Sequence, residues 1–288
     1  MPWVNFHSHC HYCDGKAAPE AYLVKAIEKG FPAYGYSSHA PLPFSTKWNM
    51  KQEQLPAYLE EIKLLKEKYK EKIQVYTGLE VDYLGRSWGF HNPFFKNIKL
   101  DYTVGSIHFV DHFPDGRPWT IDGASEEFFR GFELIFNNNV QKLVRRYYEL
   151  VKEMIIMDHP SIIGHLDKIK MHNRLKPFLD DQEGWYMDIL EETLDLIADN
   201  KCIVEVNTRG VYRYGQTDLY PGKWILGRIR QKKIPVMINS DAHLPDEINA
   251  KHAYAAAILK SIGFDSLKIL KDNRWTECPF TESGIIWD

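Results

Sequence analysis

The sequence predicts an α/β fold built on a parallel sheet, and three observations support this prediction. The chain has 288 residues, a length that α/β barrels reach as a single domain. Short β-rich runs alternate with amphipathic helical runs, which is the pattern of parallel strands joined by crossover helices. No break in composition marks a linker and no internal repeat is visible, so residues 1–288 are predicted to form one domain.

Seven strands are predicted from short runs that are rich in β-branched and aromatic residues. They cover residues 3–6, 33–36, 73–79, 102–107, 162–164, 202–206 and 234–239. Helical runs separate most of them, and connections of that length join parallel neighbours. We therefore expect a parallel sheet, either closed into a barrel or open and doubly wound.

The first helices are predicted from their ends and from their apolar spacing. One helix has Pro19 in its first turn and Gly30 just past its end, which is the usual asymmetry of helix termini. The next, over residues 55–69, carries apolar side chains at helical spacing on one face. A long helical stretch over residues 125–157 is expected to be interrupted at three successive asparagines, residues 137–139.

The second half of the chain follows the same alternation. Apolar side chains recur at strict three- and four-residue spacing over residues 186–198, which predicts an amphipathic helix. Two segments, residues 82–100 and 108–123, are longer than ordinary loops, and loops of this length often cover functional sites. The last three helices are expected over residues 224–229, 248–262 and 266–271.

The composition indicates a soluble globular protein, with 26% charged and 44% hydrophobic residues. No apolar run approaches the roughly 18 residues of a membrane-spanning helix, and the N-terminal segment lacks the pattern of a secretion signal. A net charge of −3 argues against nucleic acid as the main partner, because phosphate-backbone binding rests on many Lys and Arg contacts. We expect a cytoplasmic protein that acts on a small molecule, and the sequence leaves its oligomeric state open.

Cys10 and Cys13 form a C-x-x-C motif in a histidine-rich segment. No second C-x-x-C accompanies it, so a structural zinc ribbon is poorly supported. The chain is large enough to fold without disulfides and shows no sign of secretion. A redox pair is one interpretation of the motif, but the preferred interpretation is two thiols in a loop.

Nine histidine and carboxylate side chains follow the ends of the predicted strands, where parallel α/β folds carry their active sites. Residues two apart in an extended chain point to the same side, so the pair at 7 and 9 and the pair at 241 and 243 each share a side. The two pairs would converge if the first and last strands were neighbours, which favours a closed barrel. The nine residues are His7, His9, Asp14, His39, Glu80, His108, His165, Asp241 and His243.

This number of ligands indicates more than one metal ion. Six histidines and three carboxylates exceed the roughly four ligands that one zinc ion takes. Two or three divalent ions fit better, with three favoured, and imidazole with carboxylate suits zinc, iron or manganese. Three such ions would outweigh the three carboxylates, and the positive balance would attract an anionic substrate.

Six motifs in a fixed order carry a resemblance to a known family. With them the sequence resembles the polymerase and histidinol phosphatase (PHP) superfamily over residues 7–243, and within it the histidinol-phosphate phosphatases. The motifs are His7-Ser8-His9 with Asp14-Gly15, Ser38-His39, Gly78-Leu79-Glu80, Gly105-Ser106-Ile107-His108, Gly164-His165 and Ser240-Asp241-Ala242-His243.

The resemblance implies a distorted (β/α)7 barrel with a trinuclear metal site at the C-terminal ends of its strands. It implies an enzyme, a phosphoric monoester hydrolase that converts L-histidinol phosphate to L-histidinol and phosphate in histidine biosynthesis. It also implies three ligand sets, which are His7, His9, Glu80 and Asp241; Glu80, His108 and His165, with Glu80 bridging; and Asp14, His39 and His243.

For this reaction we hypothesise in-line attack on phosphorus by a hydroxide that bridges the first two metals, because coordination lowers the pKa of water toward about 7. Arg209, at the end of the sixth predicted strand, is the favoured phosphate ligand, since guanidinium binds phosphate bidentately, and Arg117 ranks lower. Asp241 or His243 is expected to protonate the leaving alkoxide. Asp82 would meet the substrate amine, with a structural salt bridge as the alternative.

Three other interpretations stay open. The same fold can hydrolyse another phosphomonoester, or a nucleotide or nucleic-acid phosphodiester, although the net charge of −3 counts against the latter. An amidohydrolase-type deacylase also uses H-x-H, but a carbamylated lysine often bridges its metals, whereas this chain has Glu80. A non-catalytic binding module of the same fold would be expected to lose ligands, and this chain retains all nine.

Overall fold

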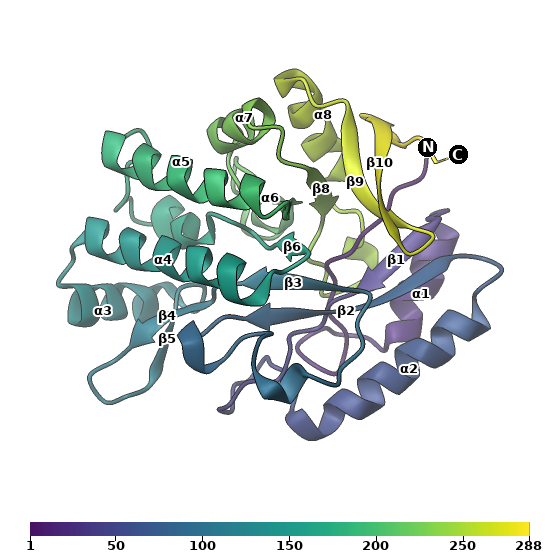
Figure 1. Ribbon diagram of the computed structural model, residues 1–288, viewed down its shortest axis with the longest axis horizontal. Helices are drawn as coiled ribbons and strands as arrows, with labels where there is room; N and C mark the ends of the chain where they lie inside the picture. Colours follow the sequence, from purple (N-terminus) through teal and green to yellow (C-terminus); the bar gives the residue numbers. More distant parts are fainter. Residues whose placement is uncertain (288) are drawn as a thin grey trace.

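The computed structural model describes residues 1–287 and confirms the α/β class (Figure 1). Residue 288, the last of the predicted domain, lies outside the described residues. The centre is a six-stranded parallel sheet in the order β1-β2-β3-β6-β7-β8, and each strand matches a predicted one to within a few residues. The strands are β1 (Ala33–Tyr36), β2 (Gln74–Asp82), β3 (Tyr102–Ser106), β6 (Ile162–Ile163), β7 (Ile203–Asn207) and β8 (Val236–Asn239).

The first predicted strand takes a different form, because it does not build a ladder of its own. Residues 3–9 run between β1 and β8, the edge strands of the parallel sheet. The amide of Phe6 donates to Asn239 Oδ1 at 2.8 Å, so a side chain replaces the backbone partner here. The sheet therefore curls into a distorted barrel, and residues 3–9, the closing segment, complete it. Isolated parallel bridges join Asn5 to Tyr34 and Ser8 to Ala242.

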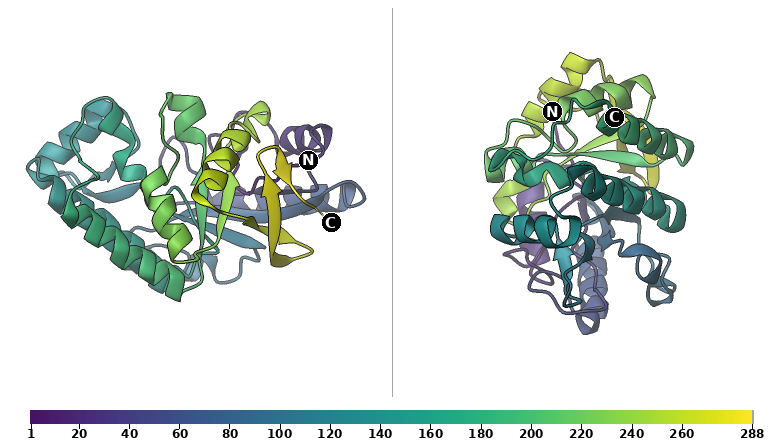
Figure 2. Two further views of the ribbon diagram at one scale, coloured as in Figure 1. Left: turned by 90° about the horizontal axis from the view of Figure 1, so that it is seen from above. Right: turned by 90° about the vertical axis from the view of Figure 1, so that its left-hand side faces the viewer.

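The helices lie outside the curled sheet (Figures 1 and 2). The predicted interruption of the long helical stretch is confirmed, because Asn137 ends one helix with a φ of +51°. Asn139 Oδ1 accepts the amide of Lys142 at 3.0 Å and begins the next helix. The predicted helices are α1 (Pro19–Glu28), α2 (Leu55–Lys68), α3 (Ser125–Phe136), α4 (Val140–Asp158), α5 (Gly184–Asp199), α7 (Lys223–Gln231) and α8 (His252–Ile262).

The prediction of a last helix over residues 266–271 is wrong. These residues form β9 (Ser266–Lys271), which pairs antiparallel with β10 (Arg274–Thr281), and β11 (Gly284–Ile285) completes a small sheet. Buried side chains largely alternate along β9, which is the period of a strand. Asp272 and Asn273 reverse the chain with φ values of +50° and +59°, the left-handed geometry of a tight hairpin turn.

The long loop over residues 108–123 contains a hairpin of β4 (Phe109–His112) and β5 (Pro118–Thr120). Figure 1 shows this hairpin and α3 beyond the arrowheads of β2 and β3, whereas β9 and β10 lie toward the other end of these strands. The hairpin is therefore at the end of the barrel where the site residues are predicted. The other long loop, residues 82–100, contains short 3₁₀ turns.

Buried apolar side chains form one cluster that extends from Trp3 to Ile285. The two ends of the chain meet, since the amide of Ile285 donates to the carbonyl of Pro2 at 2.9 Å, and Figure 2 shows both ends on the same side. The C-terminal strands therefore pack on the barrel rather than forming a separate core. Within residues 1–287, no helix is both long and apolar enough to cross a membrane.

One buried histidine outside the predicted site is expected to make the fold sensitive to acid. His252 is fully buried and packs edge-on against Trp3, with ring centroids 5.4 Å apart. Neither of its ring nitrogens has a hydrogen-bond partner among residues 1–287. Burial, together with the charge of Lys29, lowers the pKa of His252 to about 3. The folded protein therefore holds this ring neutral, whereas the unfolded chain protonates it near pH 6.5.

Replacing His252 by phenylalanine is expected to reduce the loss of stability on acidification. Between pH 6.5 and about 3 only the unfolded chain binds this proton, so the free energy of unfolding falls as the pH falls, by about 1.4 kcal/mol per pH unit. Urea unfolding at pH 7 and pH 5 measures this difference. The exposed His112 changed in the same way is the control. An unchanged pH dependence in the His252 variant would contradict the assignment.

Candidate metal centre

The structure brings the predicted ligands to the C-terminal end of the parallel strands. His7 and His9 lie on the closing segment, Glu80 lies in β2, and the others follow this segment or the ends of β1, β3, β6 and β8. Eight of the nine fall into three groups whose candidate ligand atoms lie within 4.8 Å of one another. The groups are His9, Asp14, His39 and His243; His7, His9 and Asp241; and His39, Glu80 and His108.

The two pairs of alternating residues converge as predicted, because the closing segment lies next to the loop that follows β8. The amide of His9 donates to the carbonyl of Ala242 at 2.8 Å and fixes the two segments side by side. His9 Nε2 then lies 3.1 Å from Asp241 Oδ1, and the rings of His9 and His243 are 4.1 Å apart. The barrel closure that the residue spacing predicts thus builds the centre.

Glu80 lies in the middle of the centre, with its two oxygens facing different histidines. Oε2 lies 3.2 Å from His7 Nε2 and 2.9 Å from His39 Nδ1. Oε1 accepts a hydrogen bond from Ser106 Oγ at 2.6 Å and lies 2.9 Å from His165 Nε2. A carboxylate in this position can bridge two cations, one on each oxygen.

His39 lies between two of the groups because its two ring nitrogens face different carboxylates. Nδ1 faces Glu80, whereas Nε2 lies 3.8 Å from Asp14 Oδ1. His165 is absent from the three groups and instead approaches Glu80 through Nε2. The predicted proximity of His39 to Asp14 and of His165 to Glu80 is therefore present, and the contact between His39 and Glu80 is additional.

Several atoms of the centre are buried without a hydrogen-bond partner among residues 1–287. They face one another at ion-pair distances, such as 2.9 Å between His39 Nδ1 and Glu80 Oε2, yet make no hydrogen bond, and a buried group of this kind needs a physical reason. Oxygen and imidazole nitrogen donors in this number suit zinc, iron or manganese, and the residues present therefore fit bound divalent ions. The unpartnered atoms are His7 Nε2, His9 Nε2, Asp14 Oδ1, His39 Nδ1, Glu80 Oε2 and Asp241 Oδ1.

The carboxylates of the centre stay ionised although they are buried. Burial raises the pKa of Glu80, but the neighbouring histidines, His7 foremost, bring this pKa well below its ordinary value. Burial raises the pKa of Asp241 as well, and positively charged neighbours again outweigh it. Ionised carboxylates are the form that binds metal, so the centre holds its acidic ligands ready for a cation.

Buried carboxylates hold two of the histidines from behind. His7 Nδ1 donates to Glu205 Oε1 at 2.6 Å, and His108 Nδ1 donates to Asp82 Oδ1 at 2.8 Å. Such partners fix the ring and its tautomer so that the other nitrogen faces the metal. Asp82 thus lies behind a candidate ligand. Glu205 was not predicted, although a glutamate inside the apolar strand β7 is a signal for a buried polar role.

A cavity of about 200 Å³ opens beside the centre, and four predicted ligands line it together with Arg209 and Lys168. Arg209 does not end a strand but begins α6 (Arg209–Tyr214). Its Nη1 donates to the carbonyl of Asp241 at 2.9 Å, at a residue whose φ of +54° is unusual for a side chain other than glycine. Arg209 therefore faces the cavity as predicted and also supports the backbone of a candidate ligand.

Lys168 is a second cation at this cavity, and it was not predicted. It begins the 3₁₀ segment η4 (Lys168–Arg174), and its Nζ lies 3.1 Å from Asp122 Oδ2 and 3.4 Å from His108 Nε2. Asp122 follows β5, at the end of the long loop that was expected to cover the site. The position of Lys168, three residues after His165, was the available signal.

The structure does not bring Arg117 to this cavity. It lies on the turn between β4 and β5, its Nε donates to Asp115 Oδ2 at 2.9 Å, and its side chain is 52% exposed. Asp82, behind His108, is likewise absent from the cavity lining among residues 1–287. Of the three predicted substrate-binding residues, Arg209 alone lines the cavity.

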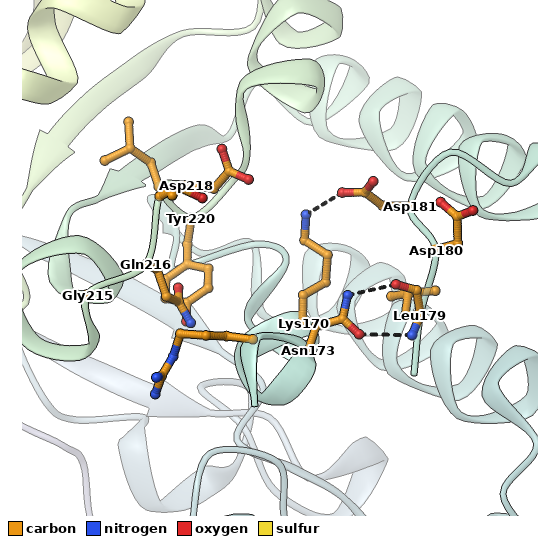
Figure 3. A pocket seen from close by; sticks show the side chains of 12 residues that line it. Lys170, Asn173, Leu179, Asp180, Asp181, Gly215, Gln216, Asp218 and Tyr220 are labelled. Atoms are coloured by element: carbon orange, nitrogen blue, oxygen red, sulfur yellow. Dashed lines mark hydrogen bonds and ion pairs between the residues drawn. The ribbon is translucent and has the colours of Figure 1, made fainter. Parts of the chain in front are cut away.

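A larger cavity of about 370 Å³ lies between η4 with its following loop and the loop after α6 (Figure 3). On one side of it Lys170 Nζ donates to Asp181 Oδ2 at 2.9 Å, and Asp218 and Tyr220 line the opposite side. Within residues 1–287, none of the predicted site residues lines it. The chemistry that the sequence predicts is therefore concentrated in the smaller cavity.

Comparisons with known proteins agree with this fold. The family profile described as PHP domain matches residues 5–209, a range that includes seven of the nine predicted ligands. A histidinol-phosphatase of Bacillus subtilis is 27% identical over 266 residues, which cover 87% of this chain and 96% of the relative.

Two solved structures share the fold. A protein of Listeria monocytogenes assigned as a histidinol phosphatase superimposes with a TM-score of 0.77 at 24% identity, over 87% of this chain and 99% of that one. The histidinol phosphate phosphatase of Lactococcus lactis was solved with zinc, L-histidinol and phosphate. It superimposes with a TM-score of 0.71 at 20% identity, over 99% of each chain. At these identities the likeness establishes the architecture.

Proposed function

The chain belongs to the PHP domain family, and from this premise we propose that it is a metal-dependent phosphomonoesterase that hydrolyses L-histidinol phosphate to L-histidinol and phosphate. One observation carries the proposal. Unpartnered carboxylate and imidazole atoms converge beside a small cavity that also presents the cations Arg209 and Lys168. Ligands for divalent ions next to cations for phosphate are what the hydrolysis of a phosphate ester requires. The names of the Bacillus and Lactococcus relatives support the choice of substrate.

We propose that the centre holds three divalent ions, of zinc, iron or manganese, with Glu80 as a bridging ligand. The orientation of the two Glu80 oxygens toward different histidines supports the bridge. When bound, such ions lower the pKa of a coordinated water toward neutrality and offset the charge of the phosphoryl oxygens. The proposed sets are His7, His9, Glu80 and Asp241; Glu80, His108 and His165; and Asp14, His39 and His243.

The remaining tasks fall to side chains around the cavity. Arg209 and Lys168 hold phosphoryl oxygens, and Arg209 can do so because the hydrogen bonds of its guanidinium to described residues use Nη1 alone. Asp241 or His243, which line the cavity, orients the water that passes a proton to the leaving alkoxide. Asp82 keeps the His108 ring turned toward the centre rather than contacting the substrate amine.

The cavity of about 200 Å³ suits a small phosphate ester better than a polymer. We propose that residues 1–288 act as one PHP domain on a small molecule of the cytoplasm. The single buried cluster from Trp3 to Ile285 supports one domain. The substrate proposed here has a phosphate group for the cations and a primary alkoxide as leaving group, and both fit the groups around the cavity.

Phosphate release from L-histidinol phosphate tests the proposal directly, beside other phosphomonoesters and a bis-aryl phosphodiester. We expect a kcat/KM of about 10⁴ M⁻¹s⁻¹ or more for L-histidinol phosphate, well above the other esters. Chelation should abolish this activity, and added zinc or manganese should restore it. Equal weak rates on all monoesters would reject L-histidinol phosphate as the substrate, and faster cleavage of the diester would favour a phosphodiesterase.

A further inference from the structure

The histidines of the centre do not all have the same kind of partner at their outer nitrogen. His7 and His108 each donate to a buried carboxylate. His9, which belongs to two of the three candidate ligand groups, has its Nδ1 3.6 Å from the Sγ of Cys13. The C-x-x-C motif therefore touches the centre through one of its thiols, at the ring nitrogen that faces away from Asp241.

The thiol of Cys13 is itself held in place by the turn that contains it. The amide of Cys13 donates to the carbonyl of Cys10 at 3.0 Å, and Sγ donates to the same carbonyl at 3.5 Å. A thiol that donates its proton in this way keeps its sulfur lone pairs for an incoming N–H.

We propose that Cys13 is a positioning residue of the metal centre, whose sulfur accepts the Nδ1 hydrogen of His9 and so keeps Nε2 directed at the metal. The chain of contacts runs from His9 Nδ1 to Cys13 Sγ and on to the carbonyl of Cys10. This inference rests on the proposed metal centre and assigns the C-x-x-C motif a place in it. Removal of an outer partner of this kind typically weakens metal binding about 10- to 100-fold.

The same geometry argues against a redox role for the motif. Cys10 is fully buried, and its Sγ lies 3.2 Å from Ser38 Oγ. Burial raises the pKa of Cys10 to about 11. Each thiol is instead engaged in a hydrogen-bond contact, Cys10 with Ser38 Oγ and Cys13 with the carbonyl of Cys10. Cys10 and Cys13 therefore act through hydrogen bonds in a tight turn.

Cobalt titration of the metal-free protein tests the proposal without relying on activity. Chelator-treated wild type, Cys13→Ala and Cys13→Ser are titrated with Co²⁺ while the visible absorption of the bound ion is followed. We expect Cys13→Ala to bind about 10- to 100-fold more weakly and to show an altered spectrum. The serine variant should regain most of the affinity, because its hydroxyl can accept from His9 and donate to the Cys10 carbonyl.

Cys202→Ala is the matched control, because it removes a buried thiol just before β7, at the opposite end of this strand from the centre. Wild-type affinity and spectrum in Cys13→Ala would overturn the proposal while leaving the metal centre in place. A sulfur-to-cobalt charge-transfer band in the wild type would overturn it too, since Cys13 would then be a direct ligand. A wild-type protein that binds no Co²⁺ would instead reject the proposed function, and the inference with it.

Discussion

Replacement of Glu80 by glutamine is expected to lower kcat/KM for L-histidinol phosphate by on the order of 10³-fold, the equivalent of about 4 kcal/mol of lost stabilisation. The Oε2 atom of Glu80 faces His7 and His39, and its Oε1 faces Ser106 and His165. An amide carries no negative charge, and its nitrogen offers hydrogens where a cation needs a lone pair. The variant should therefore lose the bridge while keeping the size of the side chain.

Metal content measured beside the kinetics identifies the cause of this loss. The variant should purify with fewer bound metal ions per chain than the wild type, with little change in helix content. Glu153→Gln is the control, because it makes the same chemical change at a glutamate of α4 that contacts Tyr83 outside the centre. Full metal content and wild-type kinetics in Glu80→Gln would remove Glu80 from the proposed centre.

The candidate ligands could be predicted from the sequence because local rules place them. A residue after a parallel strand lies at the functional end of a barrel, and residues two apart share a side. These two rules place His7, His9 and Asp241 together without knowledge of the packing. They also predict the closure, which occurs through bridges such as Ser8 with Ala242.

The partners behind the ligands could not be predicted, because they depend on how distant segments pack. Glu205 contacts His7 from 198 residues away, and Lys168 contacts Asp122, which follows the β4–β5 hairpin 46 residues earlier in the chain. No spacing rule connects such pairs. Asp82 illustrates the limit, since a structural salt bridge was one of its two predicted roles, whereas the identity of its partner, the Nδ1 atom of His108, required the structure.

The C-terminal strands were missed for a local reason. The segment Ser266–Lys271 is short, and its alternating pattern competes with a helical reading of the leucine and isoleucine positions. The chain reverses at Asp272 and Asn273, and this reversal makes the segment a hairpin rather than a helix. It depends on the left-handed backbone geometry of both residues. Aspartate and asparagine tolerate this geometry, but they predict a turn less strongly than glycine does.

Replacing Arg209 or Lys168 by alanine is expected to lower kcat/KM about 10²-fold, because each supplies a charge that meets the phosphoryl group as it reacts. Both side chains line the cavity, and both are largely buried, with 15% and 10% of the side chain exposed. Charges in such a sheltered place are weakly screened by water, so their removal costs more than loss of a surface ion pair.

The two variants should differ in a way that reveals the second role of Arg209. Lys168→Ala should weaken inhibition by inorganic phosphate while leaving metal content unchanged. Arg209→Ala should weaken that inhibition as well. It should also lower the metal content, because the carbonyl of the candidate ligand Asp241 loses its hydrogen bond from Arg209 Nη1. Arg117→Ala removes an exposed guanidinium outside the cavity and serves as the control. Unchanged KM and phosphate inhibition in both cavity variants would mean that the phosphate binds elsewhere. The proposed role of Arg209 and Lys168 in the reaction would then be wrong.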